Sequence, residues 1–140
     1  MKSFRIAALI ALAVGLAVPA AGAGKGNALP TAIGPGEGKL TMIAWEGYLD
    51  AKWVKGFEKQ SGCKAQAKYA GSSDEMVTLM RSGGGGQYDM VSAFGGASLR
   101  LIYGKDVAAV NVSLVPGWKQ FFNAFKSPPN NTVAGQHYGV

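Results

Sequence analysis

Two aromatic residues and a carboxylate fall within four positions, directly after an apolar stretch of the sequence: Trp45, Glu46 and Tyr48. The faces of Trp and Tyr rings attract cations, and one such contact is worth about 0.5–2 kcal/mol, depending on how well water is excluded. A neighbouring carboxylate adds an opposite charge for an amine. The spacing suits a site for a small cationic ligand, but a core Trp beside a solvated Glu would give the same pattern.

A second stretch that could bind a ligand is Phe94 to Gly96, which follows another apolar run. Glycine lets the backbone approach a ligand closely because it has no side chain. The same residues also suit an ordinary turn from a strand into a helix, and the sequence alone leaves both interpretations open. The candidate ligand contacts are Trp45, Glu46, Tyr48, Phe94 and Gly95.

Other polar residues have simpler explanations. Ser72 followed by Glu75 fits a capping box at the start of a helix, although a helix N-terminus also attracts anions. The run Gly83 to Gly86 lacks the Lys-Ser/Thr pair and the strand-to-helix placement of a phosphate-binding loop, so we interpret it as a connector. Asp89 lies in a predicted strand, where it can position the backbone but has no partner as a catalytic acid.

The sequence offers no convincing catalytic or metal-binding group. Cys63 is the only cysteine and His137 the only histidine, and a lone cysteine is usually a small buried apolar residue. No cluster of His, Cys, Asp and Glu has metal-ligand spacing, and no Lys/Arg block suits a phosphate backbone. We predict no enzymatic activity, no cofactor and no nucleic-acid partner. An exported hydrolase using Cys63 and His137 is the weaker alternative.

Residues 1–23 have the pattern of a secretory signal peptide. Lys2 and Arg5 precede the uncharged run Ile6 to Val18, and small residues end the segment at Ala23. A spanning helix needs about 20 apolar residues, so we expect cleavage near Ala23 and a periplasmic protein, with an uncleaved anchor as the alternative. Cleavage leaves 117 of the 140 residues and lowers the net charge from +6 to +4.

The rest of the sequence predicts alternating strands and helices after a flexible Gly/Pro-rich leader at 24–38. Apolar periodicity predicts a buried strand at 39–45, further strands at 63–70 and 88–93, and helices at 49–60, 72–82 and 97–103. Gly62 is expected to end the first helix in the left-handed conformation. A short extended piece at 107–110, a short helix after it and a strand beginning at 137 complete the prediction.

This order predicts an α/β fold, in which flanking helices cover a mostly parallel sheet. Ligands of such sheets bind beyond the carboxyl ends of the strands, near the point where the strand order reverses. The expected strand ends lie at 45–48, 70–73 and 93–96. The candidate contacts therefore fall where this architecture places a ligand.

Taken together, these segments resemble the N-terminal part of the spermidine/putrescine-type solute-binding proteins of ABC importers. The resemblance covers residues 39–140 and rests on Leu40 to Tyr48, Phe57 to Lys64, Ser73 to Met76 and Gln87 to Val91. It implies a periplasmic binding protein-like (type II) fold, in which two α/β lobes close on a ligand. Residues 39–140 would form the first part of lobe one, and we expect a fragment of a longer protein, with a non-functional truncation product as the alternative.

The resemblance also implies a function: a monomeric receptor that captures a polyamine or related amine for an importer permease in the inner membrane. Trp45 and Tyr48 would belong to the aromatic box around the ligand's methylene chain. The family's acid in this loop lies two residues after the Trp, where this sequence has Gly47, and Glu46 is one position early. Phe94 to Gly96 replace the Ser and Tyr contacts of polyamine binders, which leaves room for a ligand such as 4-aminobutyrate or a quaternary ammonium compound.

Overall fold

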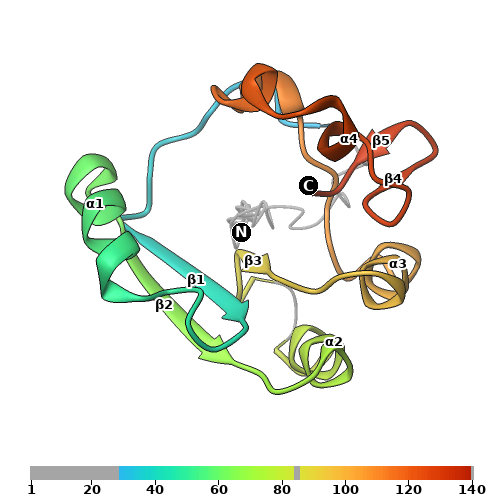
Figure 1. Cartoon of the computed structure of the whole chain (residues 1–140), viewed down its shortest axis with the longest axis horizontal. Coiled ribbons are helices and arrows are strands. Elements are labelled where there is room, and N and C mark those ends of the chain that lie inside the picture. Colours follow the sequence, from blue (N-terminus) through green and yellow to red (C-terminus); the bar gives the residue numbers. More distant parts are fainter. Residues whose placement is uncertain (1–28, 84–85, 140) are drawn as a thin grey trace, which may run out of the picture.

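The computed structural model of the chain describes residues 29–83 and 86–139, and it confirms the predicted alternation of strands and helices. A three-stranded parallel sheet with the order β2-β1-β3 contains β1 (Lys39–Ala44), β2 (Lys64–Tyr69) and β3 (Met90–Val91). Helices α1 (Ala51–Ser61), α2 (Ser73–Ser82) and α3 (Gly96–Tyr103) each follow one strand (Figure 1). The architecture is therefore α/β. The predicted signal peptide and the first part of the leader lie outside the described residues.

The chain after α3 contains only short elements in its described part. Two 3₁₀ turns, Val112–Leu114 and Trp118–Gln120, precede α4 (Asn123–Lys126) and a hairpin of β4 (Thr132–Val133) and β5 (Gln136–His137). The amide of Val110 donates to the His137 carbonyl at 2.7 Å, so the expected extended pieces at 107–110 and 137 meet in one isolated bridge. Figure 1 shows α4 and the hairpin on the side of the molecule opposite α1.

The third strand is much shorter than the predicted 88–93. The amides of Asp89 and Ser92 still donate to the Thr41 and Ile43 carbonyls, at 2.8 and 2.9 Å, but the amides of Thr41 and Trp45 have side-chain acceptors. Before β3, the Asp89 carboxylate accepts a hydrogen bond from the Thr41 amide at 2.7 Å. After β3, the Trp45 amide donates to Ser92 Oγ at 3.3 Å, and Gly95 then turns the chain with φ 60°. The position of Asp89 beside β1 agrees with its predicted role in positioning the backbone.

Helix α1 has well-formed ends. The Asp50 carboxylate accepts from the Lys52 amide at 2.7 Å, and Gly62 ends the helix at φ 74°, as predicted from the sequence. Glu58 joins the helix to β2 by accepting from Lys64 Nζ at 2.9 Å and the Ala65 amide at 3.1 Å. These hydrogen bonds, led by that from Lys64, hold the pKa of Glu58 below its usual value.

Helix α2 begins with half of the predicted capping box. Ser72 Oγ accepts from the Glu75 amide at 3.1 Å, but the Glu75 carboxylate accepts from the amide of Gly71 at 2.8 Å, one residue before the expected partner. Helix α2 is also joined to α3 and the loop after it, because Arg100 pairs with Asp74 and Arg81 Nε lies 2.9 Å from Asp106 Oδ2. α2 and α3 thus form one packed layer.

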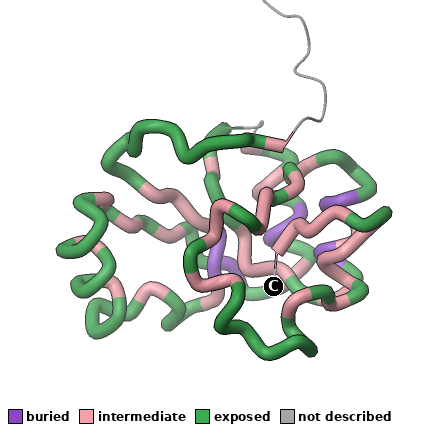
Figure 2. The backbone as a smooth tube through the Cα atoms, turned by 90° about the horizontal axis from the view of Figure 1, so that it is seen from above, coloured by how far each residue is buried: buried purple, intermediate pink, exposed green. Residues whose placement is uncertain are grey.

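The buried side chains lie between the sheet, α2 and α3. Figure 2 colours the buried residues purple. Ile43, Met76 and Leu101 are the largest fully buried side chains of the described residues. The prediction of a buried first strand holds only for Ile43 and Ala44, because α1 buries none of its own side chains. No described residue after Ile102 is buried. No helix in the described ranges has the length and apolar character needed to cross a membrane.

Candidate functional site

The loops after β1 and β3 lie side by side, as the predicted switch in strand order requires. β1 is central, so the chain leaves it toward β2 on one side and returns to β3 on the other. Trp45 Nε1 donates to the Ser92 carbonyl at 3.1 Å, and the centroids of the Trp45 and Phe94 rings are 5.9 Å apart. The tertiary structure therefore brings two of the predicted contacts together.

Trp45 is mainly a packing residue in this arrangement. Its half-buried ring packs against the core cluster of Ile43, Ala70 and Met76. The indole hydrogen bond to Ser92 fixes the orientation of the ring, and its contact with Phe94 faces the surface. The ring thus supports the neighbouring loop more than it presents a free face to a ligand.

The rest of the predicted aromatic box is open to solvent. Residues 45–48 form a turn in which the Tyr48 amide donates to the Trp45 carbonyl at 3.2 Å, with Gly47 at φ 87°. Tyr48 is 60% exposed and Phe94 is 64% exposed, and Glu46 is also exposed. Gly95 shapes the turn into α3 with its positive φ. These residues form a surface rim, not a closed box.

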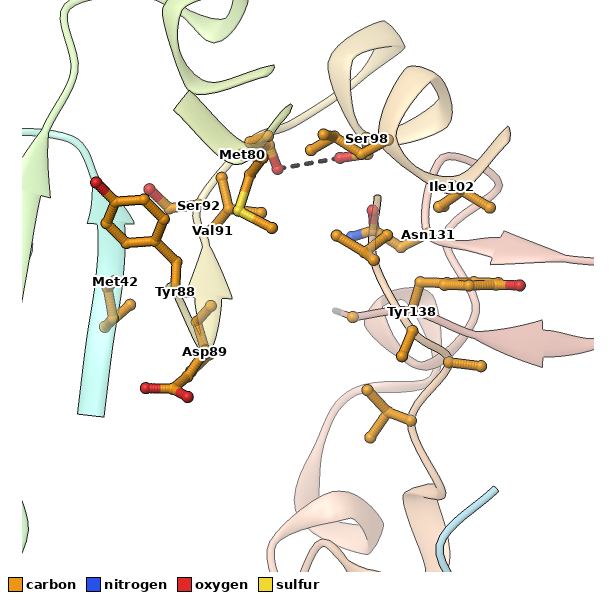
Figure 3. Close-up of a pocket in the computed structure, with 18 of the residues that line it drawn as sticks. Met42, Met80, Tyr88, Asp89, Val91, Ser92, Ser98, Ile102, Asn131 and Tyr138 are labelled. Atoms are coloured by element: carbon orange, nitrogen blue, oxygen red, sulfur yellow. Dashed lines mark hydrogen bonds between the residues drawn. The ribbon is translucent and has the colours of Figure 1, made fainter. Parts of the chain in front are cut away.

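A hollow of about 1020 Å³ lies next to this rim, between β3, α3 and the C-terminal segment. Figure 3 shows Met42, Tyr88, Asp89 and Ser92 on the sheet side, and Asn131 and Tyr138 on the other. Tyr48 and Phe94 belong to the lining, whereas Trp45, Glu46 and Gly95 do not. Most of the lining is apolar; its members from the C-terminal segment include Val112, Val115, Trp118, Phe121 and Tyr138.

Sequence reasoning missed the C-terminal wall of the hollow. Residues after Tyr103 show no helical or strand periodicity, so nothing in their pattern indicated which side chains face the sheet. Their fold depends on contacts between distant residues, such as the Val110 amide with the His137 carbonyl at 2.7 Å. Their only sequence signal was the density of aromatic residues at 118–125.

The charged side chains in the lining of the hollow are all acidic. They are Asp89 and Asp106, and no Lys, Arg or His of the described residues belongs to the lining. Arg81 already neutralises Asp106 across 2.9 Å. The wall of the hollow therefore has the opposite sign to the whole chain, whose net charge is +6.

Asp89 is the carboxylate best placed to meet a cation. Its Oδ2 accepts from the amide of Thr41 at 2.7 Å and from Thr41 Oγ1 at 2.8 Å. These two hydrogen bonds, the backbone one first, keep the pKa of Asp89 below its usual 3.8, although burial opposes them. The carboxyl group is exposed at the edge of the hollow and stays ionised at neutral pH.

The two residues of the alternative hydrolase are not brought together. Cys63 immediately precedes β2, whereas His137 lies in β5 on the other side of the molecule (Figure 1). The His137 ring instead meets the edge of Trp118, with centroids 5.2 Å apart. Among the described residues, no group of three or more His, Cys, Asp or Glu side chains could hold a metal ion.

A comparison with protein-family models found no match for this chain. The residues and the geometry of the site are therefore the basis for assigning a function.

Proposed function

We propose that this chain is the first part of lobe one of an extracytoplasmic solute-binding receptor, which captures a polyamine or related small amine for an ABC importer. The observation that carries the proposal is the charge of the hollow: the part of the chain that the structure describes contributes two carboxylates and no basic side chain to its lining. An amine is attracted to such a wall, and an anionic solute is repelled by it. The resemblance at residues 39–140 points to the same ligand class and to a periplasmic binding protein-like fold.

The proposed binding mode uses Asp89 for one ammonium group and the exposed rings of Tyr48 and Phe94 for the rest of the ligand. Charge attraction and ring faces are the two interactions that recognise alkylammonium groups. Phe94 lies five positions after Asp89, which is about 16 Å in extended backbone. A ligand that reaches both ends is long and carries more than one amine, so we expect spermidine to bind more tightly than putrescine or 4-aminobutyrate.

Calorimetric titration tests this proposal with spermidine, putrescine and 4-aminobutyrate, and with glutamate as an anionic control. We expect heat from the amines in the order given and none from glutamate. Asp89→Asn should weaken spermidine binding about tenfold, which corresponds to about 1.4 kcal/mol. Glu46→Gln is the matched control, because Glu46 is an exposed acid outside the hollow.

Two results would contradict the proposal. Absence of heat with all three amines would remove the amine assignment. If Glu46→Gln weakens spermidine binding more than Asp89→Asn does, the binding site is the loop after β1, as the sequence pattern alone suggests, and not the hollow.

A non-functional truncation product remains the second candidate, and one observation favours it. α1 buries no side chain, and the apolar side chains Trp53 and Phe57 are 65% and 42% exposed. A chain with so much uncovered apolar surface is expected to unfold without a sharp transition. Circular dichroism during heating distinguishes the two, because a cooperative transition favours a folded receptor lobe.

A further inference from the structure

Aromatic side chains gather at residues 118–126, which we call the aromatic tip. Phe122 is 77% exposed and Phe125 is 58% exposed, and their rings meet edge to face with centroids 6.3 Å apart. Trp118 and Phe121 form a second pair at 5.7 Å, and both belong to the lining of the hollow. The tip therefore has one aromatic pair at the hollow and another on the outer surface.

The charged side chains of the aromatic tip itself are all positive. Lys119 and Lys126 belong to the tip, and the sequence contains no Asp or Glu from position 107 to 140. Lys126 Nζ lies 3.4 Å from the Lys119 carbonyl oxygen and 3.2 Å from Asn123 Oδ1, so this ammonium group folds back over the tip. Exposed rings and ammonium groups thus share one segment, which has no Asp or Glu of its own.

The tip is held in place by the hairpin beneath it. The Trp118 ring contacts His137 of β5 edge to face, with centroids 5.2 Å apart. The Trp118 amide donates to the Val115 carbonyl at 3.0 Å, and the Phe125 amide donates to that of Phe122 at 2.9 Å. These contacts fix the backbone that carries Phe122 and Phe125, although both side chains remain exposed.

We propose that the aromatic tip docks onto an anionic lipid surface, with Phe122 and Phe125 at the boundary between headgroups and acyl chains. Exposed apolar rings beside lysines are the combination that favours the surface of an anionic bilayer. Each lysine near such a surface raises the affinity about fivefold. The exposed Trp53 and Phe57 of α1 lie among charges of both signs, including Glu58, and lack this complementarity.

This docking is independent of any ligand in the hollow, because Phe122 and Phe125 lie outside its lining. A local probe is needed, since the apolar run at 6–18 would itself add affinity for lipid. We would replace Cys63 by Ser and introduce Ala124→Cys, which places an environment-sensitive fluorophore between the two phenylalanines. The matched control carries the fluorophore at Tyr103→Cys, another exposed aromatic position at 72% exposure, outside the tip.

With vesicles of phosphatidylglycerol and phosphatidylcholine, the fluorophore at 124 should shift to the blue, and the fluorophore at 103 should not. Phosphatidylcholine vesicles alone, or 1 M salt, should remove most of the shift, because salt screens the lysines. Adding Lys119→Gln and Lys126→Gln should weaken the response about 25-fold, and Phe122→Ser with Phe125→Ser should abolish it while the circular dichroism spectrum stays unchanged.

Two outcomes would overturn the proposal. In one, the fluorophore at 124 does not respond to anionic vesicles, or responds no more than the fluorophore at 103. In the other, it responds to an acidic polypeptide such as polyglutamate but not to vesicles, which would make the aromatic tip a site for an acidic protein.

Discussion

Helices α1 and α2 are similar in sequence pattern but differ in what they bury. Both are amphipathic, have 11 and 10 residues respectively, and begin with a side-chain cap, at Asp50 and Ser72. α2 buries Met76 and Val77 between β1 and α3, whereas α1 buries no residue at all. An apolar stripe predicts that a helix has a face to cover, but only the arrangement of the other elements decides whether that face is covered.

The largest expected difference in the free energy of unfolding is between a variant of a core residue of α2 and a variant of an apolar residue of α1. Met76→Ala should lower the free energy of unfolding by about 2–5 kcal/mol, because it opens a cavity beside Ile43. Phe57→Ala should cost about 1 kcal/mol or less, because Phe57 is already 42% exposed. Urea unfolding followed by circular dichroism measures both values. Equal losses would mean that α1 is packed as tightly as α2 in solution.

A smaller loss of stability is expected on replacing Asp89, whose carboxylate joins the start of β3 to β1. Asp89→Asn should cost about 1 kcal/mol at pH 7, because the carboxylate accepts two hydrogen bonds from Thr41 but is exposed to solvent. Since the pKa of Asp89 is lowered by folding, its contribution is complete above pH 3.8 and disappears as the pH falls through the lower folded-state value.

Urea unfolding at pH 7 and at pH 2.5 checks this contribution. The difference between wild type and Asp89→Asn should be present at pH 7 and much smaller at pH 2.5. Thr41→Val is the comparison variant, because it removes the hydroxyl and its contacts with Asp89 and the Gln87 carbonyl but keeps the amide hydrogen bond to Asp89. A difference that is the same at both pH values would show that the carboxylate charge has no part in joining the strands.

The two helix caps are expected to contribute no more than Asp89 does, and the effects of removing them differ in kind. Ser72→Ala should lower global stability by about 1 kcal/mol, because α2 belongs to the core. Asp50→Ala should leave global stability nearly unchanged and speed amide hydrogen exchange within α1, since a helix without buried side chains opens locally. If amide hydrogen exchange in α1 follows global unfolding in both variants, then α1 does not open independently of the core, and the proposed difference between the two helices is wrong.

The local features of the first half of the chain were predictable from the sequence. The left-handed Gly62, the Ser72 cap and the order of strands and helices to Tyr103 all appear in the structure. They depend on residues close together in the chain, such as a cap and the amide two or three positions on. The parallel sheet followed from that order, because right-handed crossovers leave few alternatives.

The site was only partly predictable. The sequence placed Tyr48 and Phe94 at the carboxyl ends of adjacent strands, and the structure places both at the hollow. It gave no indication that Trp45 would be held by Ser92, that Glu46 would lie outside the hollow, or that Asp89 would lie at its edge. Each of these depends on the register between β1 and β3, which joins residues almost fifty positions apart.

By itself the sequence determined the order of strands and helices up to Tyr103 and, apart from β3, roughly where they begin and end, because caps, glycines and apolar periodicity act over one or two turns of chain. The tertiary structure alone decided that α2 buries two of its side chains and α1 buries none. It also decided that two acidic side chains line the hollow of a chain whose net charge is positive. It also decided that Phe122 and Phe125 remain exposed beside two lysines. Burial and local charge depend on which distant segments meet, and a one-dimensional pattern does not contain that information.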